Sequence, residues 1–82
     1  MQQSFHIGKE IRQELMAQER SVTWLAKKIN CNQSNLCKQL KCPHIHAELL
    51  YRISLALGED FFVRYSKHFF EDMQGKIHLN TR

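Results

Sequence analysis

The chain has 82 residues, of which 43% are hydrophobic, and it carries a formal net charge of +4 with a sequence pI near 9.2. This length predicts one domain, and the hydrophobic content is too high for a disordered tail. Three glycines and one proline argue against a loop-rich or all-β chain. The positive charge suits an anionic partner such as nucleic acid, although a modest excess of Lys and Arg is also common on plain surfaces.

Cysteine usage and hydropathy predict a reduced intracellular protein. Three cysteines form a poor disulfide framework because one of them must stay unpaired. No secretory segment opens the chain, and no apolar run approaches the roughly 18 residues that a membrane span needs. We therefore expect a soluble, cytoplasmic protein with no membrane partner.

Apolar residues fall at helical spacing almost throughout the chain, which predicts an all-α fold of five helices. The first helix is expected over residues 7–17, where Ile7, Ile11 and Leu15 recur every four residues and face the core. Gly8 should weaken the first turn of this helix, because glycine loses more backbone entropy than other residues.

Two short helices follow, and each has a clear start. Ser21 is a good N-cap for the second helix, and Asn30 is able to take the left-handed conformation that ends it. Asn32 then caps a third helix over about residues 33–41. The buried positions expected in this region are Val22, Leu25, Ala26, Ile29, Cys31, Leu36 and Leu40.

A connector containing Pro43 separates the third helix from the fourth, because proline does not fit a helix interior. The fourth helix is expected over about residues 46–57, and Gly58 is a helix C-terminal signal. Its expected inward residues are Leu49, Leu50, Ile53 and Leu57.

The fifth helix is expected to begin near Glu59 or Asp60, whose acidic side chains suit a helix N-terminus, and to continue to about residue 73. Gly75 should end it. The single domain would then have its core in residues 6–74 and a C-terminal tail over residues 75–82, which forms a strand or frays.

Aromatic residues in the fifth helix exceed what one small core needs. Val63 and Phe70 fall on an arc that suits the two-fold partner of a homodimer, unless Phe70 packs under the C-terminal tail. A second arc is assigned to the core of the monomer. This second arc contains Phe61, Phe62, Tyr65, Phe69 and Met73.

The central segment concentrates positive charge. Between Glu19 and Glu48 there are five basic residues and no acidic ones, namely Arg20, Lys27, Lys28, Lys38 and Lys41. Four of these basic residues and Thr23 flank the turn between the second and third helices, where contact with DNA phosphates is expected. The four are Arg20, Lys27, Lys28 and Lys41. The alternative is that some of these charges only confer solubility.

The third helix opens with Asn32, Gln33, Ser34 and Asn35, and Lys38 lies one turn further on. A helical projection puts Leu36 and Leu40 on the core side and Ser34, Asn35, Lys38 and Gln39 on the opposite side. Gln33 lies near the core side of this projection, but it stands in the first turn and is able to reach past the helix end. Gln or Asn pairs with adenine N6 and N7 in the major groove, and Lys reaches guanine O6 or N7. The alternative is a polar, solvated face.

Several segments together resemble the phage repressor/Cro-like (XRE-type) helix-turn-helix family. They are I-G-K-E-I-R at 7–12, the cap Ser21, L-A-K-K-I at 25–29, C-N-Q-S-N-L at 31–36 and L-L-Y-R-I-S-L-A-L-G at 49–58. The resemblance implies a five-helix repressor-like bundle whose third helix enters the major groove of double-stranded DNA. It also implies a transcriptional regulator that acts as a homodimer.

By the same resemblance, Gln33 and Ser34 match base-reading positions, and Asn35 and Lys38 match further groove-facing positions. Two positions depart from the pattern. Val22 stands where the family often has a phosphate-clamping Gln, and Lys41 and Cys42 stand where it often has Gly or Asn-Gly.

Other classes of function have less support. A protein-interaction or antitoxin-like module with the same fold is the main alternative, and an exposed Trp24 would favour it, unless Trp24 folds back on the first helix. Motifs for catalysis or for a cofactor are not evident, so we expect no enzyme and no cofactor. Five soft ligands have poor spacing for zinc, namely Cys31, Cys37, Cys42, His44 and His46.

Overall fold

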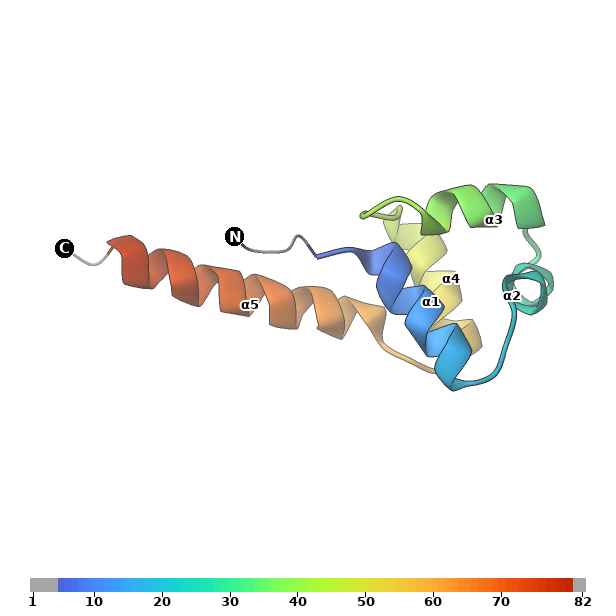
Figure 1. Cartoon of the computed structure of the whole chain (residues 1–82), viewed down its shortest axis with the longest axis horizontal. Helices are drawn as coiled ribbons and strands as arrows, with labels where there is room; N and C mark the ends of the chain where they lie inside the picture. The colour runs from blue at the N-terminus through green and yellow to red at the C-terminus, as the bar shows by residue number, and fades with distance from the viewer. Residues whose placement is uncertain (1–4, 81–82) are drawn as a thin grey trace.

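The computed structural model describes residues 5–80, with side chains for residues 5–74, and this part of the chain holds five helices and no strand (Figure 1). The helices are α1 (Ile7–Ala17), α2 (Val22–Lys28), α3 (Gln33–Leu40), α4 (Ala47–Leu57) and α5 (Phe61–Asn80). The expected all-α class is therefore confirmed. None of these helices, over the residues described, combines the length and the hydropathy that crossing a bilayer requires.

Most helix ends lie where the sequence indicated. Ser21 Oγ accepts a hydrogen bond of 3.0 Å from the backbone N–H of Trp24 and so caps α2. Asn30 follows α2 with a φ of 57°, and Gly58 follows α4 with a φ of 67°. This left-handed conformation ends a helix. At the start of α4, His46 is the N-cap rather than the first helical residue, since its Nδ1 accepts from the N–H of Glu48 at 3.3 Å.

One hydrophobic core joins all five helices. The apolar stripes expected in α1 to α4 are buried in it, with Val22, Cys31 and Leu49 only partly covered at its margin. Phe61, at the start of α5, is fully buried. Removal of apolar surface from water is the main favourable contribution to folding. The buried residues are Ile7, Ile11, Leu15, Leu25, Ala26, Ile29, Leu36, Leu40, Ile45, Leu50, Ile53, Leu57 and Phe61.

The end of α5 differs from the sequence prediction. The helix begins as expected, because Asp60 Oδ1 accepts hydrogen bonds from the N–H groups of Phe62 at 3.0 Å and Val63 at 3.1 Å. It then continues through Gly75 to Asn80, so the prediction that Gly75 ends it was wrong. A glycine inside a helix costs only about 1 kcal/mol relative to alanine and does not block the next turn. The predicted tail is therefore helical up to Asn80, and its last two residues lie outside the described part.

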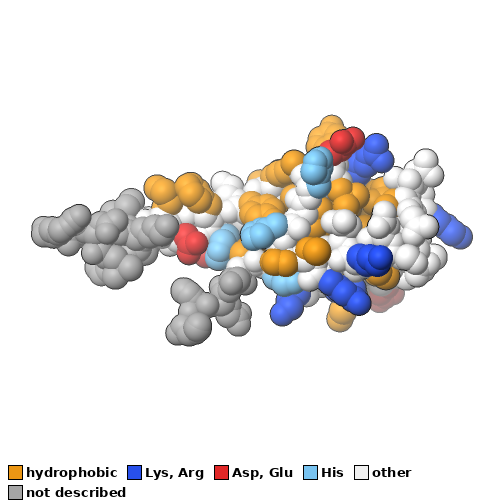
Figure 2. Space-filling model, turned by 90° about the horizontal axis from the view of Figure 1, so that it is seen from above, with side chains coloured by type: hydrophobic (Ala, Val, Ile, Leu, Met, Phe, Trp, Pro, Cys, Tyr) orange, Lys and Arg blue, Asp and Glu red, His pale blue; other side chains and the backbone are white. Residues whose placement is uncertain are grey.

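The assignment of one aromatic arc of α5 to the monomer core was also wrong. Phe61 is buried and Tyr65 is partly buried, but the side chains of Phe62, Phe69 and Met73 are 39%, 62% and 39% exposed. Figure 1 shows the reason, since α5 runs past the other helices and out to one side. Hydrophobic side chains lie along this part of α5 in the view of Figure 2.

A group of ion pairs fixes the first turns of α5 against α1. Arg64 donates to Glu10 at 2.9 Å and to Glu14 at 3.0 Å, and both carboxylates belong to α1. The same guanidinium donates to Glu59 at 2.9 Å. The Arg64 side chain is 25% exposed, so these charge-assisted bonds are partly shielded from water.

Gln18 extends this network to the end of α4. Its amide group donates to Glu14 Oε2 and to the backbone carbonyl of Leu57, each at 2.9 Å. The Gln18 hydrogen bond holds the pKa of the Glu14 carboxyl below its ordinary value, and Arg64 acts in the same direction while burial opposes both. The network therefore joins α1, α4 and α5.

Candidate nucleic-acid interface

The core and an N-terminal cap hold α3 in place. Leu36 and Leu40 are 0% and 1% exposed, and α3 packs against both α1 and α2. Asn32 Oδ1 accepts a hydrogen bond of 3.1 Å from the N–H of Asn35, which confirms the predicted cap. Lys41 is the C-cap, so α3 is one residue shorter than predicted. These contacts leave the opposite side of the helix free to face solvent.

The C-terminal end of α3 touches the backbone of α1, a contact that the sequence did not reveal. A Cβ atom on Gly8 would lie 2.7 Å from the carbonyl carbon of Leu40 and 2.9 Å from the carbonyl oxygen of Cys42. Gly8 is therefore needed for close approach, in addition to weakening its own turn. His6 strengthens the junction, since its Nε2 lies 3.1 Å from the carbonyl oxygen of Lys41 and donates to it.

The predicted base-reading residues share one exposed surface. Gln33, Ser34, Asn35 and Lys38 are all exposed. Ser34, Asn35 and Lys38 point away from the buried Leu36, whereas Gln33 lies three residues before Leu36 on the same side of the helix. Neighbours three and four residues apart on a helix project from the same face, which brings Ser34 and Asn35 close to Lys38. Gln33 lies in the first turn and is exposed as well, so these four side chains form the α3 polar face.

The residues predicted to contact phosphates lie around the α3 polar face rather than on it. Thr23 and Lys27 are exposed one turn apart on α2, which packs against α3. Lys41 is exposed at the far end of α3, about 12 Å from Gln33 along the helix axis at 1.5 Å per residue. Asn32 is exposed, but its side-chain oxygen is engaged in the cap. In Figure 2, Lys and Arg side chains gather at the globular end of the molecule.

Trp24 lies on the outer side of α2, and two basic side chains lie over its ring. The Arg20 guanidinium carbon is 4.4 Å from the centre of its ring, and Lys28 Nζ is 5.9 Å away. The indole is partly buried and packs against the core. Its ring is therefore neither a free apolar patch nor fully covered, and it restrains Arg20 and Lys28 through cation–π contacts.

Most of the soft ligands singled out in the sequence have structural contacts. Cys31 and Cys37 are partly buried, while Cys42 is exposed. His46 caps α4, and His44 Nδ1 lies 3.1 Å from the hydroxyl of Tyr65. Over the residues that the structure describes, no three His, Cys, Asp or Glu side chains come close enough to hold a metal ion.

Comparison with known proteins gives no relative from which to transfer a function. No protein-family model, curated protein or solved structure matches this chain.

Proposed function

We propose that the chain binds double-stranded DNA sequence-specifically through α3 and acts as a homodimeric transcriptional regulator. The observation that carries this proposal is the α3 polar face, in which Gln33, Ser34, Asn35 and Lys38 are exposed on a helix whose other side is buried. The major groove is about 12 Å wide and admits one α-helix. The buried Leu36 gives the helix a fixed position from which to present these groups.

The side chains of the α3 polar face have the chemistry that base edges require. The amides of Gln33 and Asn35 each offer one donor and one acceptor group, which match N6 and N7 of adenine. Lys38 donates only, which suits O6 or N7 of guanine, and Ser34 suits either class. Lys27, Lys41 and Thr23 would contact phosphates and supply affinity without sequence information.

The exposed apolar side chains of α5 support the homodimer. Val63, Phe69 and Phe70 are 56%, 62% and 60% exposed. A second copy of α5 packed across a two-fold axis would remove this surface from water. In the proposed dimer the two α3 helices would lie about 34 Å apart, on one face of the DNA, and would select a palindromic site.

The proposal is tested by selecting bound sequences from a random double-stranded DNA library. We expect Gln33→Ala to relax the preference at one base pair and to cost about 1–3 kcal/mol at the preferred site. Gln13→Ala is the matched control, because Gln13 is an exposed glutamine on α1. If both variants select the wild-type sequence with wild-type affinity, α3 is not the reading helix.

A further inference from the structure

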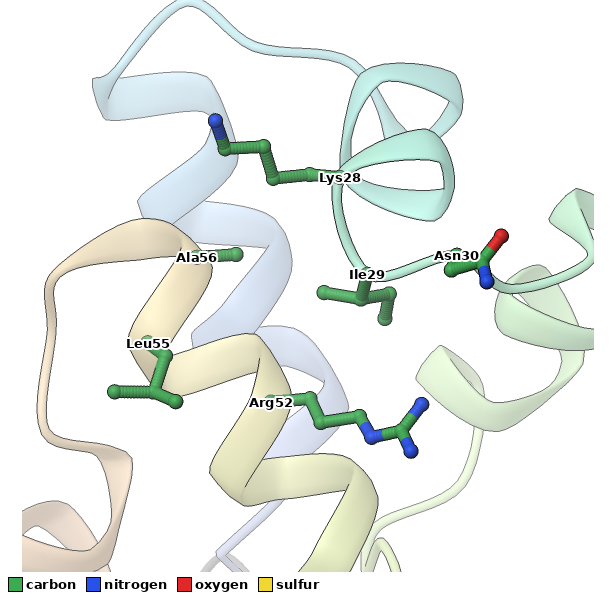
Figure 3. A pocket seen from close by; sticks show the side chains of 6 residues that line it. All are labelled: Lys28, Ile29, Asn30, Arg52, Leu55 and Ala56. Carbon is green, nitrogen blue, oxygen red and sulfur yellow. The ribbon is translucent and has the colours of Figure 1, made fainter.

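A recessed surface lies between α2 and α4. It has a volume of about 350 Å³ and is lined by Lys28, Ile29, Asn30, Arg52, Leu55 and Ala56 (Figure 3). We call it the α2–α4 cleft. None of these six residues belongs to α3. Lys28 is one of the basic residues that flank the turn between α2 and α3.

The floor of the α2–α4 cleft is apolar. Leu55 and Ala56 of α4 and Ile29 line it; in Figure 3 Ala56 points toward Ile29, whereas Leu55 points away from it, at the outer edge of the cleft. The Leu55 side chain is 67% exposed, although it stands beside a hollow into which another apolar group would fit. An apolar group seated against Leu55 would release water from both surfaces.

The rim of the cleft is basic. Lys28 comes from α2 and Arg52 from α4, and the apolar floor lies between them. None of the six described lining residues is acidic. The Glu48 Oε2 atom lies 3.6 Å from Arg52 Nη2, and both side chains are more than half exposed. This ion pair is therefore weak, and a stronger carboxylate partner would displace Glu48.

We propose that the α2–α4 cleft docks an acidic peptide segment of a partner protein, with one large apolar side chain on the floor and carboxylates beside Lys28 and Arg52. The volume is at the low end of the roughly 300–1,000 Å³ typical of small-molecule sites, and the cleft is open. A DNA phosphate would form ion pairs with Lys28 and Arg52 but would leave the Leu55 side chain exposed to water. A peptide that combines leucine with glutamate satisfies both features, and its docking does not depend on DNA binding.

The fluorescence of Trp24 is the measured signal for peptide binding. Trp24 is the single tryptophan, and Lys28 Nζ at the rim of the cleft lies 5.9 Å from the centre of its ring. The probe is a short synthetic peptide, blocked at both ends, with one leucine flanked by glutamates. We expect saturable quenching of Trp24 fluorescence in the full chain, weaker at high salt. A peptide with glutamine in place of glutamate should bind about tenfold more weakly at low salt.

Matched variants locate the binding site. Leu55→Asp should weaken peptide binding at least tenfold. Met16→Asp should not, because Met16 is a similarly exposed apolar residue on α1, outside the cleft. Arg52→Glu should weaken it about tenfold and Lys9→Glu should not. The fold of each variant is checked by circular dichroism.

Two outcomes would overturn the docking proposal. One is a lack of saturable binding at peptide concentrations up to about 1 mM. The other is an equal loss in Leu55→Asp and Met16→Asp. A cleft that instead serves DNA would show itself as loss of DNA affinity in Leu55→Asp without any effect on the peptide.

Discussion

Arg64 on α5 donates a hydrogen bond of 2.9 Å to Glu10 on α1, across 54 positions of the chain. The same guanidinium reaches two more carboxylates, so three acidic side chains converge on one cation. Because α5 extends beyond the core, this group sets the direction in which the helix leaves the globule.

We expect Arg64→Ala to lower the free energy of unfolding by about 1–3 kcal/mol, since it leaves three partly shielded carboxylates without their cation. Arg52→Ala is the control, because its ion pair with Glu48 is largely exposed and should contribute less than about 1 kcal/mol. Urea denaturation measures both. Equal stabilities of the two variants would show that the Arg64 network contributes no more than a surface pair.

Acid should weaken the network. The folded-state pKa of Glu14 is lowered, so its contribution to stability is present above its ordinary value of 4.5 and is lost as the pH falls through the folded-state pKa. We expect Glu14→Gln to lose less stability than the wild type between about pH 7 and about pH 3. Glu71→Gln, on the exposed part of α5, should keep the wild-type acid sensitivity. An unchanged pH profile in Glu14→Gln would contradict this assignment.

Gly8→Ala should destabilise the protein, even though alanine is the better helix former. The new Cβ would collide with backbone atoms of Leu40 and Cys42, at an expected cost of about 1–3 kcal/mol. Gly58→Ala is the control for backbone strain without a steric clash. Gly58 has a φ of 67°, but no atom lies within 4 Å of the added Cβ. A rise in melting temperature for Gly8→Ala would mean that α1 and α3 are not in close contact.

Phe70→Glu should convert the proposed homodimer to a monomer, because it places a charge in an apolar interface. Light scattering at tens of micromolar measures the mass. Met16→Glu, at a more exposed apolar site on α1, should leave the dimer intact. The α5 interface is ruled out if the wild type is monomeric, or if the Phe70→Glu variant still dimerises.

Salt should weaken DNA binding if Lys27 contacts a phosphate. Each such contact contributes a slope of about −0.9 in log K against log salt. Lys27→Ala should therefore make the slope shallower by about 1 and reduce affinity equally for all sequences. Lys67→Ala on α5 provides a control, since Lys67 is exposed but distant in the chain from the α3 polar face. A wild-type slope near zero would contradict phosphate contact altogether.

Local signals were enough to predict most of the fold. Ser21, Asn32 and Gly58 act through neighbours within a few residues, so their roles could be inferred from the sequence. Gly75 could not be judged in this way, because a glycine permits a helix end but does not require one. The exposure of Phe69 depends on how far α5 extends past the core, which a helical projection does not contain.

Some features of the candidate site could also be predicted from the sequence, and others could not. Exposure of Ser34 and Lys38 follows from the spacing of Leu36 and Leu40, and the sequence predicted it. Gln33 is exposed although the projection puts it near the core side, because it stands in the first turn of α3. The close approach of Gly8 to Leu40 and the stacking of Arg20 on Trp24 depend on packing geometry. The α2–α4 cleft likewise joins residues from two helices that are separated by more than twenty positions.

The contact of Gly8 with the carbonyl of Leu40 is made by main-chain atoms, and this has an evolutionary consequence. Backbone atoms are common to every residue, so the seating of α3 against α1 does not depend on which side chains line its outer surface. Gln33, Ser34 and Lys38 are therefore open to exchange over generations while the helix keeps its place. A lineage with this scaffold would vary the chemistry of the exposed side of α3 by point substitution, without first rebuilding the domain.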